Sequence, residues 1–581
     1  TLVSGRELPM HLGLPTRSVH GLPVIEHAEF GRNVPDETVP DADKMELGKI
    51  YHMGREEKAD LILNRQAMAS HTFVTGSTGT GKSNAVYHLL DEITKDGRTS
   101  FLVVEPAKGE YKNVFGSRAD VKVFGTNPRE TPLLRINPFA FPQDIHILEH
   151  IDRLVEIFNA CWPMYAAMPA VLKEAIERSY QKAGWNLRNS ESEKGVFPTF
   201  FDLLDILPGV IEESHYSKDT QSDYVGALCT RVKSLTNGIY GSVFCAEDAL
   251  SDAELFDCNV VVDLSRVGSM ETKSLLMGIL VMKLQEYRMC GSEMNSRLRH
   301  VTVLEEAHNL LRKTSAEQSQ EGANLQGKSV EMLANAIAEM RTYGEGFIIA
   351  DQAPGLLDMS VIRNTNTKII LRLPDEEDRK LVGKSAALKE AQIDELSKLP
   401  LGVAAVYQNE WPEAVLCKIE AYPMPENAVY HKPSKMPHEI NAEFVFGQLA
   451  AGKELEPLSI SEMEQLKLWL KRHEMMLKPE DCRYLEQVFA GGELDVAKTR
   501  KAVFDFFGGI STVVDYCAAA EKSFTPRKEF LEQLQGQYGL KAAAADWVLN
   551  SVISMGMSLN PDAKAVDNLR TNFEQQGGRV L

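Results

Sequence analysis

The chain has 581 residues, of which 44% are hydrophobic and 25% charged, and its formal net charge is −19. This length exceeds what a single hydrophobic core supports and predicts about two to four domains, and no apolar run approaches the roughly 20 residues that span a bilayer. The acidic charge argues against unspecific attraction of the whole surface to nucleic acid, but not against a ring with a locally basic pore.

The N-terminal segment shows no clear secondary-structure pattern, and the first clear strand and helix are predicted after it. Residues 1–46 hold scattered Pro and Gly and are interpreted as an irregular lead-in, or as the remnant of a β-rich domain that begins upstream of Thr1. A strand is predicted at 47–51. Residues 71–75 form a short apolar and β-branched run typical of a buried strand, and residues 84–94 have the apolar spacing of a helix.

The turn between this strand and this helix fits the phosphate-loop pattern G-x-x-x-x-G-K-[ST]. It consists of Gly76, Ser77, Thr78, Gly79, Thr80, Gly81, Lys82 and Ser83, and Asn84 follows it as a further candidate contact. Its backbone N–H groups and the helix N-terminus are expected to enclose the triphosphate of ATP, while Lys82 neutralises phosphate charge and the Ser83 hydroxyl binds Mg²⁺. A flexible turn with a chance lysine is the alternative interpretation, which the flanking strand and helix disfavour.

Strands and helices alternate through the rest of the predicted core. Helical spacing dominates residues 143–250 and predicts a helical insertion, and residues 424–581 are expected to form a helical C-terminal domain. Further apolar runs predict buried strands at 99–104, 260–264, 301–304, 346–350 and 367–371. Apolar strands that alternate with helices are typical of a mostly parallel sheet covered on both faces. The predicted fold is therefore α/β, with a core formed by residues 47–142 and 251–423.

Two neighbouring glutamates follow one of these predicted strands. Glu305 is expected to complete the Mg²⁺ shell and Glu306 to prepare the attacking water, as P-loop enzymes require. Two solvated glutamates at the start of a helix are the alternative interpretation. Near two further strands, Gln352 is a candidate sensor of the γ-phosphate, and Arg341 and Arg372 are candidates for stabilising phosphoryl charge. A surface salt bridge is the alternative for each arginine.

An ordered set of motifs gives the chain a specific resemblance. The set comprises His71 with the phosphate loop, Glu105-Pro106 leading to Gly109-Glu110-Tyr111, Arg135-Ile136-Asn137-Pro138, Val262-Asp263-Leu264-Ser265, Glu305-Glu306-Ala307-His308, Arg341-Thr342-Tyr343-Gly344, Asp351-Gln352 and Ile370-Leu371-Arg372-Leu373. Over residues 47–420 the chain thereby resembles the HerA branch of the HerA/FtsK superfamily. The resemblance implies a RecA-like core that assembles into a hexameric ring and pumps double-stranded DNA with ATP. It also implies that Arg341 acts across the subunit interface.

The sequence departs from the family pattern at several points. Ser70 stands where members often carry a basic residue, and Asp351-Gln352 stands where they commonly show Thr-Gln. The small β-barrel typical of the family is not recognisable in residues 1–46 and is expected upstream of Thr1. The helical insertion resembles the all-α insertion of related conjugation and type IV secretion ATPases.

Several weaker signals favour ordinary structural roles. Residues 374–380 superficially resemble a nuclease acid–lysine cluster, but its elements are too closely spaced, so a solvated loop is predicted. His71 and His308 lack the spacing of metal ligands and are expected to be packed or hydrogen-bonded. The eight cysteines contain no C-x-x-C pair, which favours reduced thiols. Arg312, Lys313 and Lys328 form either a DNA-facing loop or an ordinary surface loop.

The resulting hypothesis is a cytoplasmic ATPase that forms a hexamer, uses ATP and Mg²⁺, and moves duplex DNA for a separate nuclease or antiviral defence effector, without a membrane. A type IV secretion or conjugation-type ATPase is one alternative. A nucleotide-dependent oligomeric scaffold that recruits an effector is another.

Overall fold

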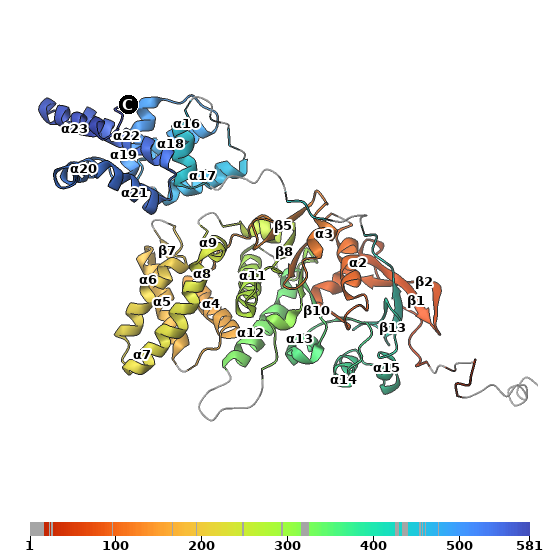
Figure 1. Cartoon of the computed structure of the whole chain (residues 1–581). Helices are drawn as coiled ribbons and strands as arrows, with labels where there is room; N and C mark the ends of the chain where they lie inside the picture. The colour runs from red at the N-terminus through yellow and green to blue at the C-terminus, as the bar shows by residue number, and fades with distance from the viewer. Residues whose placement is uncertain are drawn as a thin grey trace, which may run out of the picture.

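A computed structural model (Figure 1) describes most of the chain. The described residues are 17–21, 24, 27–35, 37–95, 97–165, 167–192, 195–246, 249–291, 294–314, 325–424, 429–432, 440–452, 455, 457–458, 460–473 and 476–581, of which 291, 460, 461, 464, 468, 471, 472 and 521 are described by their backbone alone. Residues 1–16 and a few later positions of the predicted lead-in therefore lie outside the described residues.

A single 11-stranded sheet forms the centre of the described molecule. Its strands in spatial order are β2 (Arg55–Asn64), β1 (Lys44–His52), β13 (Val415–Ile419), β12 (Val403–Gln408), β11 (Thr367–Ile370), β3 (Thr72–Thr75), β10 (Glu345–Asp351), β9 (His300–Glu305), β4 (Ser100–Glu105), β8 (Asn259–Asp263) and β5 (Val121–Gly125). From β11 to β5 all neighbours are parallel, and from β2 to β11 they are antiparallel. The predicted mostly parallel sheet is confirmed.

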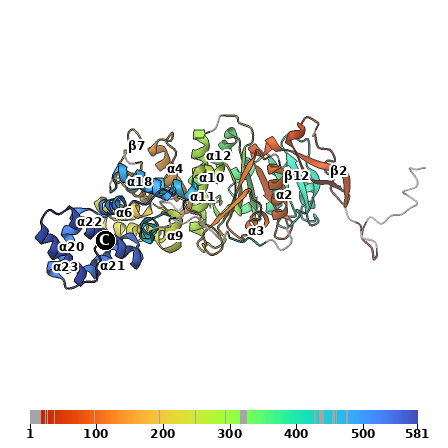
Figure 2. The same ribbon diagram turned by 90° about the horizontal axis from the view of Figure 1, so that it is seen from above.

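The parallel strands are buried on both faces because their side chains alternate between two hydrophobic cores. Phe73 and Leu102 belong to one core, whereas their neighbours Val74 and Phe101 belong to the other. The second core includes the buried faces of α2 (Lys82–Thr94) and α3 (Tyr111–Phe115). The first includes α11 (Met270–Gly291) and α12 (Leu325–Glu339). The sheet is thus covered by helices on both sides, as Figure 2 shows from above.

A layer of helices lies between β5 and β8 in the sequence, where helical spacing predicts them. They are α4 (Ile147–Cys161), α5 (Met168–Lys182), α6 (Phe200–Glu213), α7 (Lys218–Tyr224), α8 (Thr230–Thr236), α9 (Gly238–Phe244) and α10 (Asp252–Phe256), with a small hairpin of β6 (Trp185–Asn186) and β7 (Glu191–Ser192). Their apolar residues extend the same core that α11 and α12 join. A capping box formed by Thr199 and Asp202 fixes the start of α6.

Three short helices lie between β10 and β12, and they include one difference from the sequence-based expectation. They are α13 (Met359–Arg363), α14 (Glu376–Ser385) and α15 (Glu390–Glu395). The acidic run that predicts a solvated loop instead starts α14, because the Asp375 side chain accepts a hydrogen bond from the backbone N–H of Asp378. The acids of the first turn favour this helix through its dipole.

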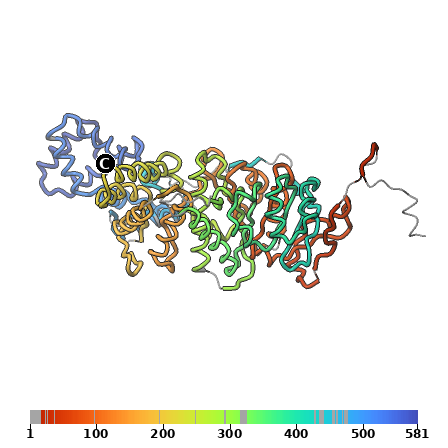
Figure 3. The backbone as a smooth tube through the Cα atoms, turned by 90° about the horizontal axis from the view of Figure 1, so that it is seen from below, coloured from red at the N-terminus to blue at the C-terminus, as the bar shows by residue number. Residues whose placement is uncertain are grey.

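The C-terminal residues form a helical region with a hydrophobic core of its own, at one end of the molecule (Figures 1 and 3). Its helices are α16 (Ala442–Ala451), α17 (Ile460–Arg472), α18 (Pro479–Phe489), α19 (Val496–Phe506), α20 (Ile510–Lys522), α21 (Pro526–Tyr538), α22 (Ala542–Leu559) and α23 (Ala563–Gln575). Phe504, Phe506 and Phe507 are buried in this core, in agreement with the apolar pattern of the sequence.

Within the described residues, no individual helix combines the length and apolar character needed to cross a membrane. One pair of helices, Val496–Phe506 and Ile510–Ala520, reaches that length and composition together, but the two are bent by 72°.

Candidate active site

The phosphate loop joins β3 to α2, as the sequence predicts. Gly79 and Gly81 have φ values of 76° and 105°, a region that side chains with a Cβ rarely adopt. A Cβ on Gly76 would lie 2.7 Å from both Leu371 Cβ and Thr80 Oγ1, so this glycine allows the loop to pass close to the strand beside it. The loop therefore has the backbone that lets consecutive N–H groups face one anion.

A cavity of about 290 Å³ lies against this loop. It is lined by Ser77, Thr78, Gly79, Gly81, Lys82, Ser83, Asn84, Lys108, Gln352 and Leu401. The cavity brings the N-terminus of α2 together with groups from β10 and from the segment after β4. A triphosphate at this position would meet the helix N-terminus and two lysines, which is the arrangement that favours anions.

Two acids from the end of β9 reach the same place. Lys82 Nζ lies 3.0 Å from Glu305 Oε2 and 3.0 Å from Glu306 Oε1. The side chains of Lys82 and Glu305 are each 7% exposed and that of Glu306 is 12% exposed. Burial by itself would lower the pKa of Lys82, but the two carboxylates outweigh it, and the pKa of Lys82 is raised. The structure thus brings the predicted lysine and both predicted glutamates into one ion-paired cluster.

Gln352 completes a chain of contacts from the loop to Glu306. Thr78 Oγ1 donates to Gln352 Oε1 at 2.6 Å, and Gln352 Nε2 donates to Glu306 Oε1 at 2.5 Å. Glu306 itself has a left-handed backbone, with φ 45° and ψ 52°. Such a conformation costs about 1–3 kcal/mol for a residue with a side chain and is retained only where neighbours hold it.

Residues of the motif after β4 support Glu305. Tyr111 Oη donates to Glu305 Oε1 at 2.5 Å, from a fully buried position. The Glu105 carboxylate accepts from the backbone N–H groups of Glu110 and Tyr111 at 2.8 and 3.0 Å, and so folds the motif into a turn. Burial raises the pKa of Glu105 to about 7. This motif contributes to the family resemblance, but the sequence alone assigns these residues no role in the site.

Lys108 is a second cation at the cavity that sequence reasoning missed. It lies on the turn that Glu105 organises, its side chain is 47% exposed, and it lines the same cavity as Lys82. The available signal was its place beside Gly109 in the motif Glu105-Pro106-Ala107-Lys108-Gly109, directly after a buried strand. A solvated lysine at that position can approach phosphate oxygens as a point charge.

The two predicted arginines lie at opposite ends of the parallel strands. Arg372 follows β11 at the loop's edge, where its carbonyl accepts from Ser77 N and Ser77 Oγ at 3.0 and 3.1 Å while its side chain is exposed. Arg341 lies in the turn Met340–Tyr343 before β10, at the opposite edge, and is exposed. Because β10 has seven residues, about 20 Å of strand separates Arg341 from the acids of the same chain.

The remaining predicted contacts differ in how the structure uses them. Ser83 lines the cavity, and also a smaller pocket with Glu305. The Asn84 side chain donates to the carbonyl of Glu420 and accepts from the backbone N–H of Tyr422, both at 2.8 Å, and so ties α2 to the segment after β13. Arg312, Lys313 and Lys328 are exposed, and residues 315–324 between them lie outside the described residues.

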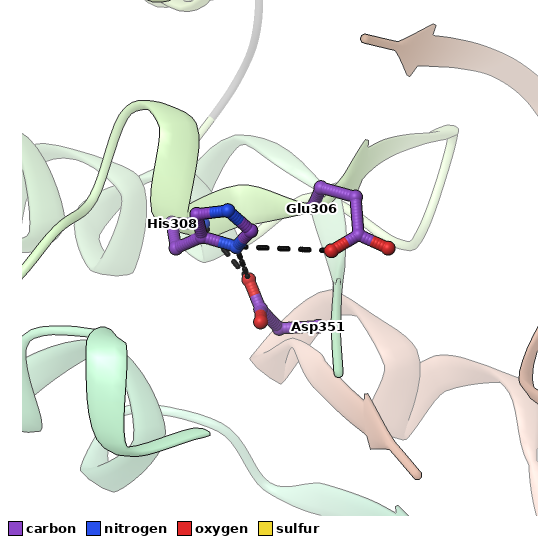
Figure 4. A group of neighbouring side chains, drawn as sticks. All are labelled: Glu306, His308 and Asp351. Atoms are coloured by element: carbon purple, nitrogen blue, oxygen red, sulfur yellow. Dashed lines mark hydrogen bonds and ion pairs between the residues drawn. The ribbon is translucent and has the colours of Figure 1, made fainter. Parts of the chain in front are cut away.

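The two histidines of the sequence analysis are both hydrogen-bonded. His71 lies before β3, and its Nδ1 accepts from the backbone N–H of Phe347 at 3.1 Å. His308 lies beside the acids, and Figure 4 shows one of its ring nitrogens directed at both Glu306 and Asp351. These three residues offer ligand atoms within 4.8 Å of one another. His308 Nδ1 is 2.9 Å from Asp351 Oδ2, which is the length of a direct hydrogen bond.

Comparison with known proteins shows what this chain is similar to. A protein-family model described as "Helicase HerA, central domain" matches residues 45–280. A DNA double-strand break repair helicase HerA of Sulfolobus acidocaldarius is 26% identical over 394 residues, which cover 66% of this chain and 71% of that protein. A probable helicase of Methanocaldococcus jannaschii is 23% identical over 436 residues, which cover 68% of this chain and 76% of that protein.

A solved structure supports the fold. The structure of VirB4 of Thermoanaerobacter pseudethanolicus aligns with a TM-score of 0.50 at 19% identity, and it covers 66% of this chain and 98% of its own. The shared architecture is the RecA-like P-loop core that the sheet order and the phosphate loop define. The matched HerA central domain and the HerA relatives support a HerA-like P-loop ATPase, and the likeness to VirB4 supports the fold alone.

Proposed function

We propose that this ATPase is a double-stranded DNA translocase that works as a hexameric ring. The observation that carries the proposal is the placement of Arg341. It is exposed at the amino ends of the parallel strands, whereas Lys82, Glu305 and Glu306 lie at their carboxyl ends. About 20 Å separates it from the acids of its own chain, so an arginine that stabilises phosphoryl charge from this position acts on a neighbouring copy. One relative is described as a DNA double-strand break repair helicase, which supports DNA as the cargo.

The roles within one site follow from the contacts. Lys82 and the loop's N–H groups bind the phosphates, and Lys82 leaves the two glutamates to do so. The Ser83 hydroxyl and the Glu305 carboxylate are hard oxygen donors that line one pocket, so they fit Mg²⁺. The chemistry that Mg²⁺ supplies in such sites is neutralisation of charge on the β- and γ-phosphates.

Glu306 is the group that orients the attacking water and accepts its proton. Gln352 links Glu306 to Thr78, so it senses the γ-phosphate through a hydrogen bond on each side. Arg372 contributes charge from within the same subunit, since its backbone is bonded to the loop, and Arg341 contributes charge from the next subunit. The dependence of hydrolysis on assembly follows from this division.

The proposal extends to a partner. We infer that a separate nuclease or antiviral defence effector uses the motor, and that the C-terminal helices, which fold around their own core, are available for such an interaction. On this view the chain alone hydrolyses ATP and moves along linear duplex DNA but leaves that DNA uncut.

The test is ATP hydrolysis with and without linear duplex DNA, for the wild type, Lys82→Ala and Glu306→Gln. The wild type should be stimulated strongly by duplex DNA. Lys82→Ala should lose nucleotide binding, and Glu306→Gln should bind nucleotide but hydrolyse it at least about 100-fold more slowly, because it cannot accept a proton. Turnover that is indifferent to DNA would contradict the translocase and favour the secretion-type ATPase or the scaffold.

A further inference from the structure

Asp351 is a buried acid whose oxygens are all directed at backbone and side-chain donors around the active site. Its side chain is 0% exposed. Oδ2 accepts from both the backbone N–H and Nδ1 of His308, each at 2.9 Å. Oδ1 accepts from the backbone N–H of Ala353 at 2.9 Å. Since a carboxylate only accepts hydrogen bonds, the proton between the two side chains lies on His308 Nδ1. Asp351 therefore fixes the position, the orientation and the tautomer of this imidazole.

The fixed imidazole faces the proposed catalytic glutamate. His308 Nδ1 lies 3.7 Å from Glu306 Oε2, and Figure 4 shows the imidazole directed at this carboxylate. The other oxygen, Oε1, accepts from Gln352 Nε2 at 2.5 Å. Asp351 and Gln352 are consecutive residues at the end of β10. The end of β10 thus supports both oxygens of Glu306. Gln352 contacts Oε1 directly, and Asp351 acts on Oε2 through His308.

We propose that His308 and Asp351 are positioning residues that hold the Glu306 carboxylate in the orientation needed to activate water. This inference rests on the proposed role of Glu306. It assigns a function to two residues that the phosphate-loop chemistry leaves unused.

The need for such support follows from the backbone and from the neighbouring lysine. Glu306 has a left-handed conformation, which is unfavourable without surrounding contacts. Lys82 contacts the same Oε1 that Gln352 does, and a bound triphosphate competes for that ammonium group. Once Lys82 binds phosphate, Gln352 and His308 are the described groups that remain against the two oxygens. The hydrogen bond to Asp351 raises the pKa of His308.

The experiment is a double-mutant cycle on ATP hydrolysis by the full chain with saturating duplex DNA. The single variants are His308→Ala, Asp351→Asn and Glu306→Gln, and the doubles combine His308→Ala with each of the other two. His27→Ala is the matched control, because His27 Nδ1 also lies 2.9 Å from a carboxylate, that of Glu395, and has similar exposure. Binding of a fluorescent ATP analogue and the melting temperature report whether each variant folds. If Asp351→Asn does not fold, His308→Gln replaces it as the second variant of the test.

A positioning role predicts a specific pattern. His308→Ala and Asp351→Asn should each lower kcat about 10-fold or more while KM for MgATP changes less than about 2-fold. The His308→Ala/Asp351→Asn double should be no slower than His308→Ala alone, because Asp351 acts through His308. In the Glu306→Gln background, His308→Ala should leave the residual single-turnover rate within about 2-fold. His27→Ala should match the wild type.

Two results would overturn the inference. One is a kcat near that of the wild type in well-folded His308→Ala and Asp351→Asn. The other is an equal loss from His308→Ala with and without Glu306, since His308 would then act elsewhere. Wild-type turnover by Glu306→Gln itself would instead contradict the proposed function, so the two failures are distinguishable.

Discussion

His71 is a buried titratable residue that directly precedes β3, a central strand of the sheet. It has a left-handed backbone, with φ 64°, and only 2% of its surface is exposed. Its ring accepts a hydrogen bond from the backbone N–H of Phe347 and contacts the Phe347 ring edge-on. Burial lowers the pKa of His71 to about 4. The folded state therefore favours the neutral ring, and protonation of His71 at low pH destabilises the fold.

The pH dependence of stability follows from this shift. Between pH 6.5 and pH 4 the unfolded chain binds a proton at His71 and the folded chain does not, so stability is complete above the unfolded pKa and falls as the pH falls. We expect the wild type to lose on the order of 3 kcal/mol over this range relative to His71→Asn, a residue that tolerates the left-handed backbone. Unfolding free energies at several pH values check this, and parallel curves for the two proteins would contradict it.

At the residue scale, the sequence predicts the ingredients of the site better than their contacts. Lys82, Glu305, Glu306 and Gln352 are identified from motifs, because their chemistry depends on short local patterns. The pairing of His308 with Asp351 joins residues 43 apart, and that of Tyr111 with Glu305 joins residues 194 apart. Such pairs depend on which strands become neighbours in the sheet, and no local pattern encodes that.

At the level of elements, β1 is joined to the sheet through an unusually close approach. Gly48 in β1 has a φ of 153°, and a Cβ at this position would lie 2.2 Å from the Lys418 carbonyl oxygen of β13. This contact lies where β1 carries the β1–β2 hairpin along the sheet edge. The hairpin's attachment thus depends on a position without a side chain.

The substitution Gly48→Ala should therefore destabilise the core by about 2–4 kcal/mol, because the backbone of β13 must move. Gly54→Ala is the matched control: Gly54 has a φ of 76° in the turn of the same hairpin, and a Cβ there would meet nothing within 4 Å. It should cost about 1 kcal/mol from backbone strain alone. Thermal unfolding of both variants measures the difference. Equal losses would mean that β13 adjusts freely.

The same elements define how far sequence patterns predict the fold. The continuous apolar runs predict β3, β4, β8, β9, β10 and β11 to within a residue or two, because strands buried on both faces contain few polar residues. The missed strands of the 11-stranded sheet are β2, β5, β12 and β13, and the small hairpin of β6 and β7 is not predicted either. β2 begins Arg55-Glu56-Glu57-Lys58, where an edge strand faces solvent, so its charged half resembles a loop. β5 is short and places a lysine between two valines.

At the scale of the whole assembly, a ring built as proposed shares each site between two chains. Glu306→Gln and Arg341→Ala should each be inactive alone. In a random equal mixture, about a quarter of the interfaces would combine an intact Glu306 with an intact Arg341 from the next chain, and activity should return toward that fraction. Mixed rings are confirmed by differently tagged subunits before ATP hydrolysis is measured.

The control for this mixture uses two residues of one chain. Lys82 and Glu306 are in direct contact within the same subunit, so a mixture of Lys82→Ala with Glu306→Gln creates no intact site and should remain inactive. No recovery in confirmed rings of Arg341→Ala with Glu306→Gln would place Arg341 outside the site. Recovery in the control would mean that mixing restores activity without an arginine from the next chain.

The ion pairs of Lys82 also bear on the sequence in which ligands arrive. Its ammonium group already neutralises both carboxylates, so a free divalent cation would have to displace a buried partner without any compensation. A triphosphate provides that compensation, because it draws the ammonium away and brings its own cation. Magnesium is therefore expected to bind together with its nucleotide and not before it. The nucleotide-free site would then hold no metal ion between turnovers.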